Sequence, residues 1–303
     1  MGLADRTPPT VPQYDAYRER YLNWGRWGDD DQLGTLNHIT EETRRSAAAL
    51  VTEGRSVTCA LPLAKTPGPM NPNPAQHFMR INPGGAMDYI GVSYHGFVNT
   101  HIDALCHMFA DDGQLYNGRP SSEITTDGAK TNSIDFWRDG IVTRGVLYDI
   151  PRMRGTAHVD QDAPVEGWDL QDAAKEVGIE PRPGDAVLVR SGRAPFIEAN
   201  PTHGHPMQNP TPGVAASAIE FLYETDASLL GWDLQEANPQ DLPRLPIHSI
   251  VIPYMGMPLL DNANFEELAA ICAELGRWEF QLVIAPLIVE GGTGSPVNPI
   301  AVF

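Results

Sequence analysis

The chain has 303 residues and carries a formal net charge of −18. This length allows one or two domains with a sizeable core, and 42% hydrophobic with 20% charged residues excludes wholesale disorder. An acidic surface repels nucleic-acid phosphates and no basic cluster offsets it, so we expect no nucleic-acid partner.

The first half of the chain combines short predicted elements with a long loop. Residues 1–22 are predicted to form an N-terminal arm, and its tyrosines Tyr14, Tyr17 and Tyr21 are suited to packing. The elements expected next are a helix at 41–52 capped by Thr40, a strand at 57–63, a Pro-, Gly- and Asn-rich loop at 65–88, and an extended segment at 89–98.

The second half alternates predicted strands and helices. The elements expected there are a buried strand at 141–150, a helix at 170–177, a strand at 186–191, a loop at 195–213, a helix at 214–225, strands at 229–233 and 247–252, a helix at 264–275 and a strand at 280–289. Strands and helices interleaved in this way favour an α/β fold.

Cysteine usage and hydropathy indicate the compartment. Cys59, Cys106 and Cys272 lie far apart with no C-x-x-C pair, which is typical of a reducing environment. The N-terminus lacks the apolar stretch of a signal peptide, and the longest apolar run, at 282–289, contains a proline and is too short to span a bilayer. We therefore expect a cytoplasmic protein with no membrane partner.

Several common catalytic motifs are missing from the sequence. There is no G-x-x-x-x-G-K-[ST] phosphate loop, no G-x-G-x-x-G dinucleotide turn and no H-E-x-x-H zinc motif. The nearest approach to a G-x-S-x-G nucleophile elbow lies at 91–95, where His95 stands at the position of the second glycine. Nucleotide and serine-hydrolase chemistry are therefore disfavoured.

A cluster of ionisable residues is the strongest functional signal. His95, His101, Asp103 and His107 lie within thirteen residues of one another. On an extended segment His101 and Asp103 project from one face, and His107 returns to the same place if the chain turns into a helix. Two imidazoles and a carboxylate suit zinc or manganese, and such an ion lowers the pKa of a bound water to about 7.

The same residues also have a structural interpretation. A histidine on a buried strand is commonly a satisfied core residue, and Asp103 can cap a following helix. The spacing alone leaves both interpretations open.

The segment from Thr100 to His107 resembles the signature H-x-G-T-H-x-D-x-P-x-H of a cyclase family that includes bacterial kynurenine formamidase and isatin hydrolase. Thr100, His101, Asp103 and His107 match it in register. Further segments that look like those of longer members are 23–28, 140–145, 183–187 and 291–299. The resemblance implies the swivelling β/β/α (cyclase-like) fold, with residues 23–303 as a single catalytic domain that follows the arm at 1–22.

The chain departs from this signature at its first ligand. Phe97 stands where the family has its first histidine, Asn99 replaces the glycine and Leu105 replaces the proline. If the ligand is retained, His95 is the nearest candidate to supply it, and a bulge can absorb the shift of two residues.

The resemblance also implies roles for individual residues. His101 and Asp103 correspond to metal ligands, and His107 corresponds to the catalytic acid/base. Dinuclear members take further ligands from a downstream histidine and carboxylate, which His248 and Asp261 match in position, although the family usually has Glu where Asp261 stands. Glu236 and Asp233 are candidates to orient a ligand histidine.

Three aromatic residues are candidates for binding the substrate. Trp24, Trp27 and Tyr116 can line an apolar pocket, and packing of the N-terminal arm is the alternative.

We expect a metal-dependent hydrolase that cleaves a small amide, lactam, lactone or N-formyl substrate by metal-activated water. The implied partners are this small molecule and further copies of the chain, since family members commonly form dimers or tetramers and the aromatic arm suits an exchange between subunits. The alternatives are a metal-dependent lyase or cyclising dehydratase on the same site, and a catalytically inactive binding protein because of Phe97.

Overall fold

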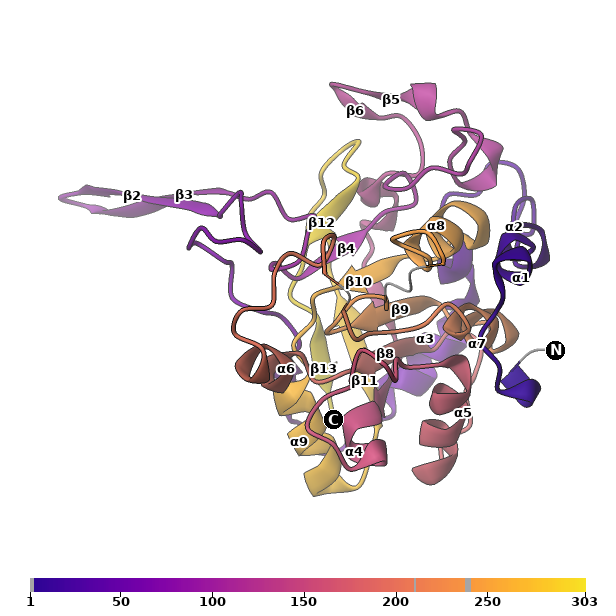
Figure 1. The fold of residues 1–303 in the computed structure, drawn as a ribbon. Coiled ribbons are helices and arrows are strands. Elements are labelled where there is room, and N and C mark those ends of the chain that lie inside the picture. Colours follow the sequence, from indigo (N-terminus) through magenta and orange to yellow (C-terminus); the bar gives the residue numbers. More distant parts are fainter. Residues whose placement is uncertain (1–2, 210, 238–240) are drawn as a thin grey trace.

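A curled mixed sheet forms the centre of the molecule (Figure 1), in a computed structural model that describes residues 3–209, 211–237 and 241–303. Its strand order is β1-β13-β11-β7-β8-β9-β10-β4-β12. The strand bounds are β1 Ser56–Thr58, β4 His101–Asp103, β7 Ile141–Asp149, β8 Ala186–Arg190, β9 Leu229–Trp232, β10 Leu259–Asp261, β11 Glu279–Ile284, β12 Gly294–Pro296 and β13 Ile300–Val302. Two separate hairpins pair β2 Gln76–Asn82 with β3 Gly85–Gly91, and β5 Ile124–Thr125 with β6 Gly128–Ala129.

Short helices surround this sheet. The α-helices are α1 Val11–Asp15, α2 Tyr17–Arg20, α3 Glu41–Ala48, α4 Ile150–Arg154, α5 Gly167–Glu176, α6 Arg193–Ala199, α7 Ala218–Glu224, α8 His248–Ile250 and α9 Glu266–Leu275. A π-helical turn at Val251–Met255 continues α8 directly. Among the described residues, none of the helices combines the length and the apolar character that crossing a bilayer requires.

Strand alternation divides the core into two layers. On β7, Val146 and Tyr148 join one apolar cluster together with residues of α5 and α7, whereas Leu147 joins a second cluster together with residues of α9. The central strands β7, β8 and β9 run parallel and are covered on both faces, so almost all of their side chains are buried instead of alternating between core and solvent.

Most predicted elements are confirmed, with shorter bounds. Three predictions are wrong in whole or in part. The predicted loop at 65–88 contains β2 and most of β3, and the predicted strand at 247–252 is α8 with the π-helical turn. A short apolar run buried on all sides has no period that separates a strand from a helix, which explains the second error. The predicted loop at 195–213 also overlaps α6.

The N-terminal arm packs on its own chain. Tyr14, Tyr17 and Tyr21 are all buried, and the Tyr14 hydroxyl donates a hydrogen bond of 2.8 Å to the carbonyl of Pro246. The Tyr17 hydroxyl donates to Glu220 on α7. The aromatic residues expected to serve in an exchange between subunits are therefore covered within the chain itself.

A buried ion-pair network joins strands β7 and β11 to the residue that precedes β8. The Arg144 guanidinium on β7 donates two hydrogen bonds, of 2.8 and 2.6 Å, to the carboxylate of Asp185, and a third of 2.7 Å to Glu279 on β11. The side chain of Arg144 is only 7% exposed and that of Asp185 only 5%. Loss of the arginine would leave a buried carboxylate without its cation.

We predict that Arg144→Ala lowers the free energy of unfolding by about 3–5 kcal/mol, since a buried charge is left without its partner. Arg45→Ala is the matched control, because Arg45 pairs with Glu41 and Glu42 at a side-chain exposure of 64% and should cost less than ~1 kcal/mol. Urea unfolding followed by circular dichroism measures both. Equal losses of unfolding free energy in the two variants would contradict the stabilising role of the buried Arg144 ion pair.

Candidate metal centre

Strand β4 carries the centre of the site. It lies between β10 and β12, and its alternation points His101 and Asp103 to one face while Ile102 enters the apolar core. The antiparallel register of β10 with β4 places Asp261 directly opposite His101. His101, Asp103 and Asp261 are all buried.

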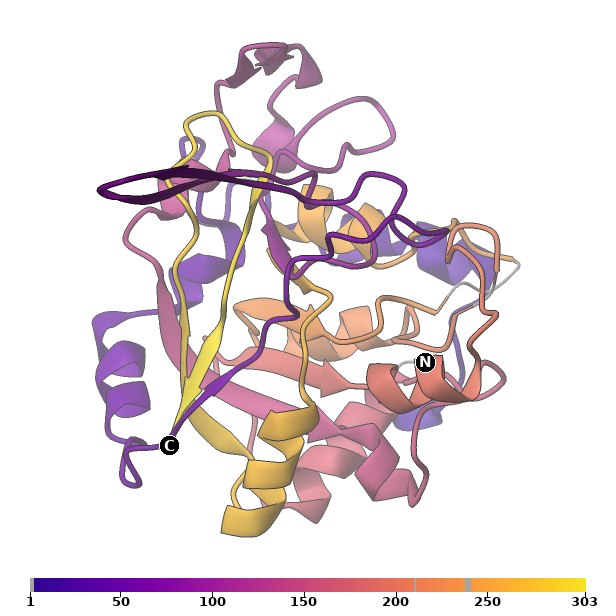
Figure 2. The same cartoon turned by 90° about the vertical axis from the view of Figure 1, so that its left-hand side faces the viewer.

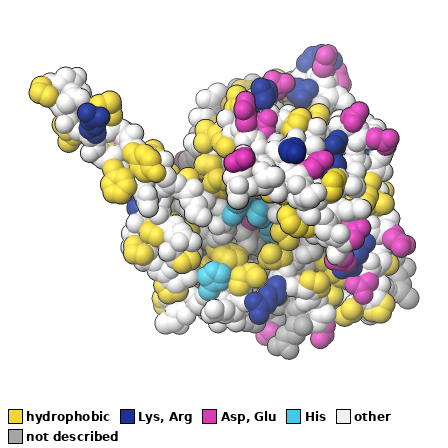
Figure 3. Space-filling model, turned by 90° about the horizontal axis from the view of Figure 1, so that it is seen from above, with side chains coloured by type: hydrophobic (Ala, Val, Ile, Leu, Met, Phe, Trp, Pro, Cys, Tyr) yellow, Lys and Arg dark blue, Asp and Glu magenta, His cyan; other side chains and the backbone are white. Residues whose placement is uncertain are grey.

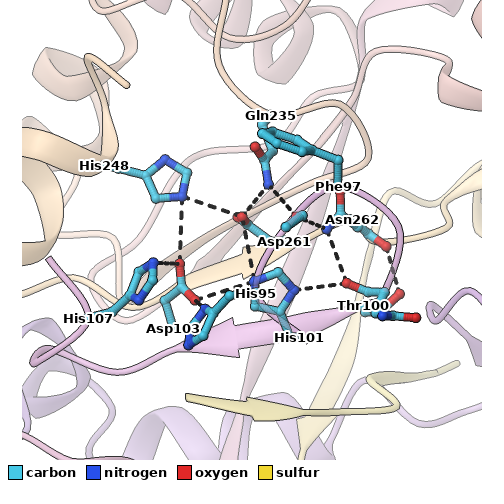
Figure 4. A network of polar contacts seen from close by, with 12 residues as sticks. His95, Phe97, Thr100, His101, Asp103, His107, Gln235, His248, Asp261 and Asn262 are labelled. Carbon is cyan, nitrogen blue, oxygen red and sulfur yellow. Dashed lines mark hydrogen bonds and ion pairs between the residues drawn. The ribbon is translucent and has the colours of Figure 1, made fainter. Parts of the chain in front are cut away.

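Three further histidines reach this strand from other segments (Figure 4). His95 follows β3, His107 follows β4, and His248 begins α8. His107 returns to the cluster through a turn closed by a 3.0 Å hydrogen bond from its backbone N–H to the carbonyl of Ala104, and not through the helix that the sequence suggested.

The ionisable side chains form two groups that share Asp103. One group is His95, His101 and Asp103, and the other is Asp103, His248 and Asp261; within each, one ligand atom per residue lies within 4.8 Å of the others. Asp103 Oδ1 lies 2.9 Å from His95 Nδ1 and 3.4 Å from His101 Nε2. Asp103 Oδ2 lies 3.6 Å from His248 Nε2. The shared carboxylate can therefore contact a cation on either side.

Each of the three candidate ligand histidines is anchored through its other ring nitrogen. The anchoring contacts are His101 Nδ1 to the Asn99 carbonyl at 2.8 Å, His248 Nδ1 to Glu236 Oε1 at 2.6 Å, and His95 Nε2 to Thr293 Oγ1 at 3.0 Å. Such contacts fix the ring and its tautomer, as is typical of metal-ligating histidines. The role suggested for Glu236 is therefore supported, whereas Asp233 accepts backbone hydrogen bonds from residues 191–193.

Asp261 is held by two donors. The Trp232 indole N–H donates to Asp261 Oδ1 at 2.5 Å, and the Gln235 amide donates to Oδ2. Asp261 Oδ2 also lies 3.4 Å from His248 Nε2. Although Asp is shorter than the Glu that the family usually has here, the Asp261 carboxylate therefore still reaches His248.

The electrostatics of the cluster favour a cation. In the described part of the chain, neither oxygen of the buried Asp103 carboxylate accepts a hydrogen bond of good geometry, although His95 Nδ1 lies 2.9 Å from Oδ1. Burial alone raises its pKa, but the histidines around it, His107 first, outweigh burial and hold that pKa well below its usual value. Burial alone lowers the pKa of His248, but Glu236 and Asp261 outweigh it and raise that pKa well above its usual value. A divalent ion fits these ligand atoms, since its positive charge would take the place of the protons that the carboxylates hold on the neighbouring histidines.

Comparison with known proteins identifies the family. The family model described as "Putative cyclase" matches residues 35–239. A solved structure described as a novel cyclase is 31% identical, covers 94% of this chain and 99% of its own, and superposes with a TM-score of 0.83. The chain belongs to this cyclase family.

Two other solved structures share the fold of the family. Isatin hydrolase A from Labrenzia aggregata, bound to benzyl benzoate, is 19% identical, with 84% of this chain and 94% of that chain covered and a TM-score of 0.60. A predicted metal-dependent hydrolase from Bacillus stearothermophilus is 15% identical, with 82% and 97% covered and a TM-score of 0.50. A search of curated proteins finds no match. The predicted α/β fold of the cyclase type is confirmed.

This chain lacks the first histidine of the cyclase signature, and His95 lies against Asp103 instead. The His95 ring stacks on the His107 ring with centroids 3.9 Å apart and planes 5° apart. Phe97, at the signature position, instead points its ring toward His205, 4.9 Å away. The chain therefore offers an imidazole to Asp103 despite the substitution at Phe97.

His107 belongs to neither ligand group, and its Nε2 lies 3.8 Å from Asp103 Oδ2. Burial lowers the pKa of His107 to about 4, although Asp103 acts in the opposite direction. The ring is therefore neutral near pH 7 and can accept a proton.

The three aromatic residues predicted to bind substrate contact other parts of the molecule. The Trp24 ring stacks on Tyr254, and its indole N–H donates to Pro253 at 2.7 Å. Trp27 packs edge-on against His38, and the buried Tyr116 donates to Asp31 at 2.9 Å. These contacts favour the packing alternative.

Several residues that position the proposed metal ligands were not predicted from the sequence. Thr293 anchors His95, and a Cβ at Gly294 would lie 3.1 Å from the His95 ring and 2.5 Å from the Ile102 carbonyl. Both belong to the Gly-rich segment at 291–299, which resembles the family but was given no role. No feature of the sequence pointed to Gln235.

We predict that Thr293→Val weakens metal binding about 10- to 100-fold, because His95 loses the hydroxyl that orients it. Thr125→Val, at an exposed position on β5, is the control and should bind metal like the unmodified protein. Competition with a chromogenic chelator measures the affinity. Equal affinity of all three proteins would show that the Thr293 hydroxyl does not support the metal site.

Proposed function

We propose that this protein is a metal-dependent hydrolase that cleaves a small amide, lactam, lactone or N-formyl substrate. The observation that carries the proposal is the buried Asp103 carboxylate, which lies among anchored imidazoles and accepts no hydrogen bond of good geometry from the described residues. The names of two neighbours, an isatin hydrolase and a metal-dependent hydrolase, support hydrolysis rather than elimination.

The proposed ligands divide between two positions. His95, His101 and Asp103 would hold one zinc or manganese ion, and Asp103 with His248 and Asp261 would hold a second. When bound, the metal supplies a Lewis acid for the carbonyl oxygen and lowers the pKa of a water molecule to about 7.

His107 is the proposed acid/base. Its Nε2 faces the cluster, and the ring is neutral near pH 7 because burial lowers its pKa to about 4. We infer that Nε2 accepts the proton of the attacking water and then donates it to the leaving nitrogen or oxygen. The stack on His95 fixes the plane of the ring, and Nε2 lies 3.8 Å from Asp103 Oδ2.

An apolar cavity beside the cluster supports an apolar group on the substrate. Its lining includes Phe97, Phe196, Ile197, Met207 and Leu234. The cavity adjoins the proposed ligands, because Gln235 and Asn262 also line it and Gln235 donates to Asp261. Figure 3 shows histidine side chains at a hollow on the face of the molecule seen from above.

We further propose that the protein acts in the cytoplasm. Its three cysteines are all free thiols and all buried, as expected where disulfides do not form.

We predict that His107→Asn lowers kcat by a factor of about 100 or more, because no group then carries the proton. Bound metal should remain unchanged, since His107 is in neither ligand group. His158→Asn, which replaces a half-buried histidine outside the cluster, should leave both quantities unchanged. Full activity of His107→Asn would exclude the assigned role.

We predict that a strong chelator abolishes activity on cyclic amides, lactones or N-formyl anilines, and that zinc or manganese restores it. Hydrolysis in ¹⁸O-labelled water should place one labelled oxygen in the product carboxylate. A product without the label would indicate elimination. Activity that survives complete metal removal would refute the metal-dependent mechanism.

A further inference from the structure

The apolar cavity beside the proposed metal centre also contains positive charge. Two arginines line it, Arg193 at the start of α6 and Arg244 on the connection from β9 to α8. Figure 2 looks onto the side of the molecule that carries α6, and the chain that follows this helix rises at the right of the view. The whole chain has only 21 Lys and Arg residues against 39 Asp and Glu, so two arginines at one apolar cavity need an explanation.

The guanidinium of Arg193 binds only neutral groups. Its Nη1 donates hydrogen bonds of 3.2 Å to the Asp233 carbonyl and to Asn262 Oδ1. Its Nη2 donates to the Phe97 carbonyl. Among the described residues, no carboxylate lies within ion-pair distance of this guanidinium and its Nε–H has no acceptor. Arg193 therefore keeps a donor and an unpaired charge for a ligand.

Nearby carboxylates compensate this charge only in part. Both carboxylate oxygens of Asp233 accept hydrogen bonds from backbone N–H groups of residues 191–193 and 234. Burial lowers the pKa of Arg193, and Asp233 and Asp261 act in the opposite direction without cancelling that effect. Arginine nevertheless stays charged in proteins. An anion that enters the cavity would complete the compensation.

Two further side chains of the cavity wall have no polar partner. Arg244 is exposed, and its guanidinium forms no hydrogen bond or ion pair with any described residue. The His203 ring packs edge-on against Phe196 with centroids 5.0 Å apart, and its buried Nε2 has no hydrogen-bond partner in the same part of the chain. Both residues line the cavity, so each can contact a ligand that enters it.

The acidic residue at the cavity is already occupied. Glu236 is the only Asp or Glu among the described residues that line the cavity. Its Oε1 lies 2.6 Å from His248 Nδ1, and its Oε2 accepts hydrogen bonds of 2.7 and 3.0 Å from the backbone N–H groups of Ile247 and His248. Glu236 therefore serves the metal centre and leaves the two arginines without an acidic partner.

We propose that this cavity binds a carboxylate carried by the apolar part of the substrate, with Arg193 and Arg244 as the binding groups. The inference rests on the proposed hydrolase function, which places the amide or ester bond at the metal centre. Asn262 joins the two sites, because it accepts a hydrogen bond from Arg193 and follows the proposed ligand Asp261 in the chain. Guanidinium groups match carboxylates in geometry, and the apolar surroundings strengthen such a contact.

The local arrangement matters because the chain as a whole repels anions. With a net charge of −18, long-range attraction cannot bring a carboxylate to the site. Selection for an acidic substrate must therefore come from direct contacts, and salt screens a close contact inside a cavity much less than it screens the surface charge.

Calorimetric titration of the whole, metal-loaded chain with 4-methylbenzoate and its neutral counterpart 4-methylbenzamide tests the proposal. The carboxylate should bind at least about tenfold more tightly, because hydrogen bonds between charged groups are stronger than those of a neutral amide. The preference should survive treatment with a chelator, which removes the metal as a competing site for the carboxylate. Equal binding of the two compounds, or a preference that disappears with the metal, would overturn the proposal.

Substitution of the exposed arginine locates the binding site. Arg244→Gln should reduce the preference for the carboxylate to less than about threefold, and Arg244→Glu should reverse it. Arg44→Gln is the matched control, because Arg44 on α3 is also exposed and its side chain has no polar partner among the described residues. All three variants should keep the circular dichroism spectrum of the unmodified protein. An unchanged preference in both Arg244 variants would overturn the assignment.

Hydrolysis of 4-formamidobenzoate and 4-formamidobenzamide separates this proposal from the proposed function. The acid should have the higher kcat/KM by at least about tenfold, and Arg244→Gln should remove that advantage mainly through KM. Equal hydrolysis of both compounds would retain the hydrolase and overturn the carboxylate site. Binding of 4-methylbenzoate that depends on Arg244, without hydrolysis of either formamide, would support the carboxylate site and contradict only the proposed reaction.

Discussion

The buried carboxylate of Asp103 carries a negative charge that the groups around it must compensate. A carboxylate removed from water costs several kcal/mol unless a cation or hydrogen-bond donors compensate it. Here ring nitrogens of His95, His101 and His248 lie 2.9, 3.4 and 3.6 Å from its oxygens, and none of these contacts has good hydrogen-bond geometry. Each of these rings is anchored elsewhere, so the unused nitrogens and the carboxylate together form a site suited to a divalent ion.

The chain compensates for the missing signature histidine through its local path. Phe97 turns toward the apolar cavity, and His95 reaches Asp103 from two residues earlier. Gly294 leaves space for the His95 ring, and the Tyr94 hydroxyl donates to the Gly294 carbonyl at 2.8 Å. The segment that follows the β2–β3 hairpin therefore supplies a proposed ligand.

Local sequence patterns predicted part of this arrangement. The period of two along a strand placed His101 and Asp103 on one face, and β4 confirms that placement. His248 and Asp261 lie more than a hundred residues away, and only the family resemblance suggested them, because no local pattern encodes the pairing of β10 with β4. The hairpin was missed because its Pro- and Gly-rich tip reads as a loop, and apolar side chains on both faces remove the usual alternation.

X-ray diffraction recorded at the zinc and manganese absorption edges, on crystals grown with these ions, tests the central claim most directly. The account predicts an anomalous peak within ligand distance of His95, His101 and Asp103, and it allows a second peak beside His248 and Asp261. Crystals that hold the metal only elsewhere, or whose Asp103 carboxylate contacts water alone, would contradict it.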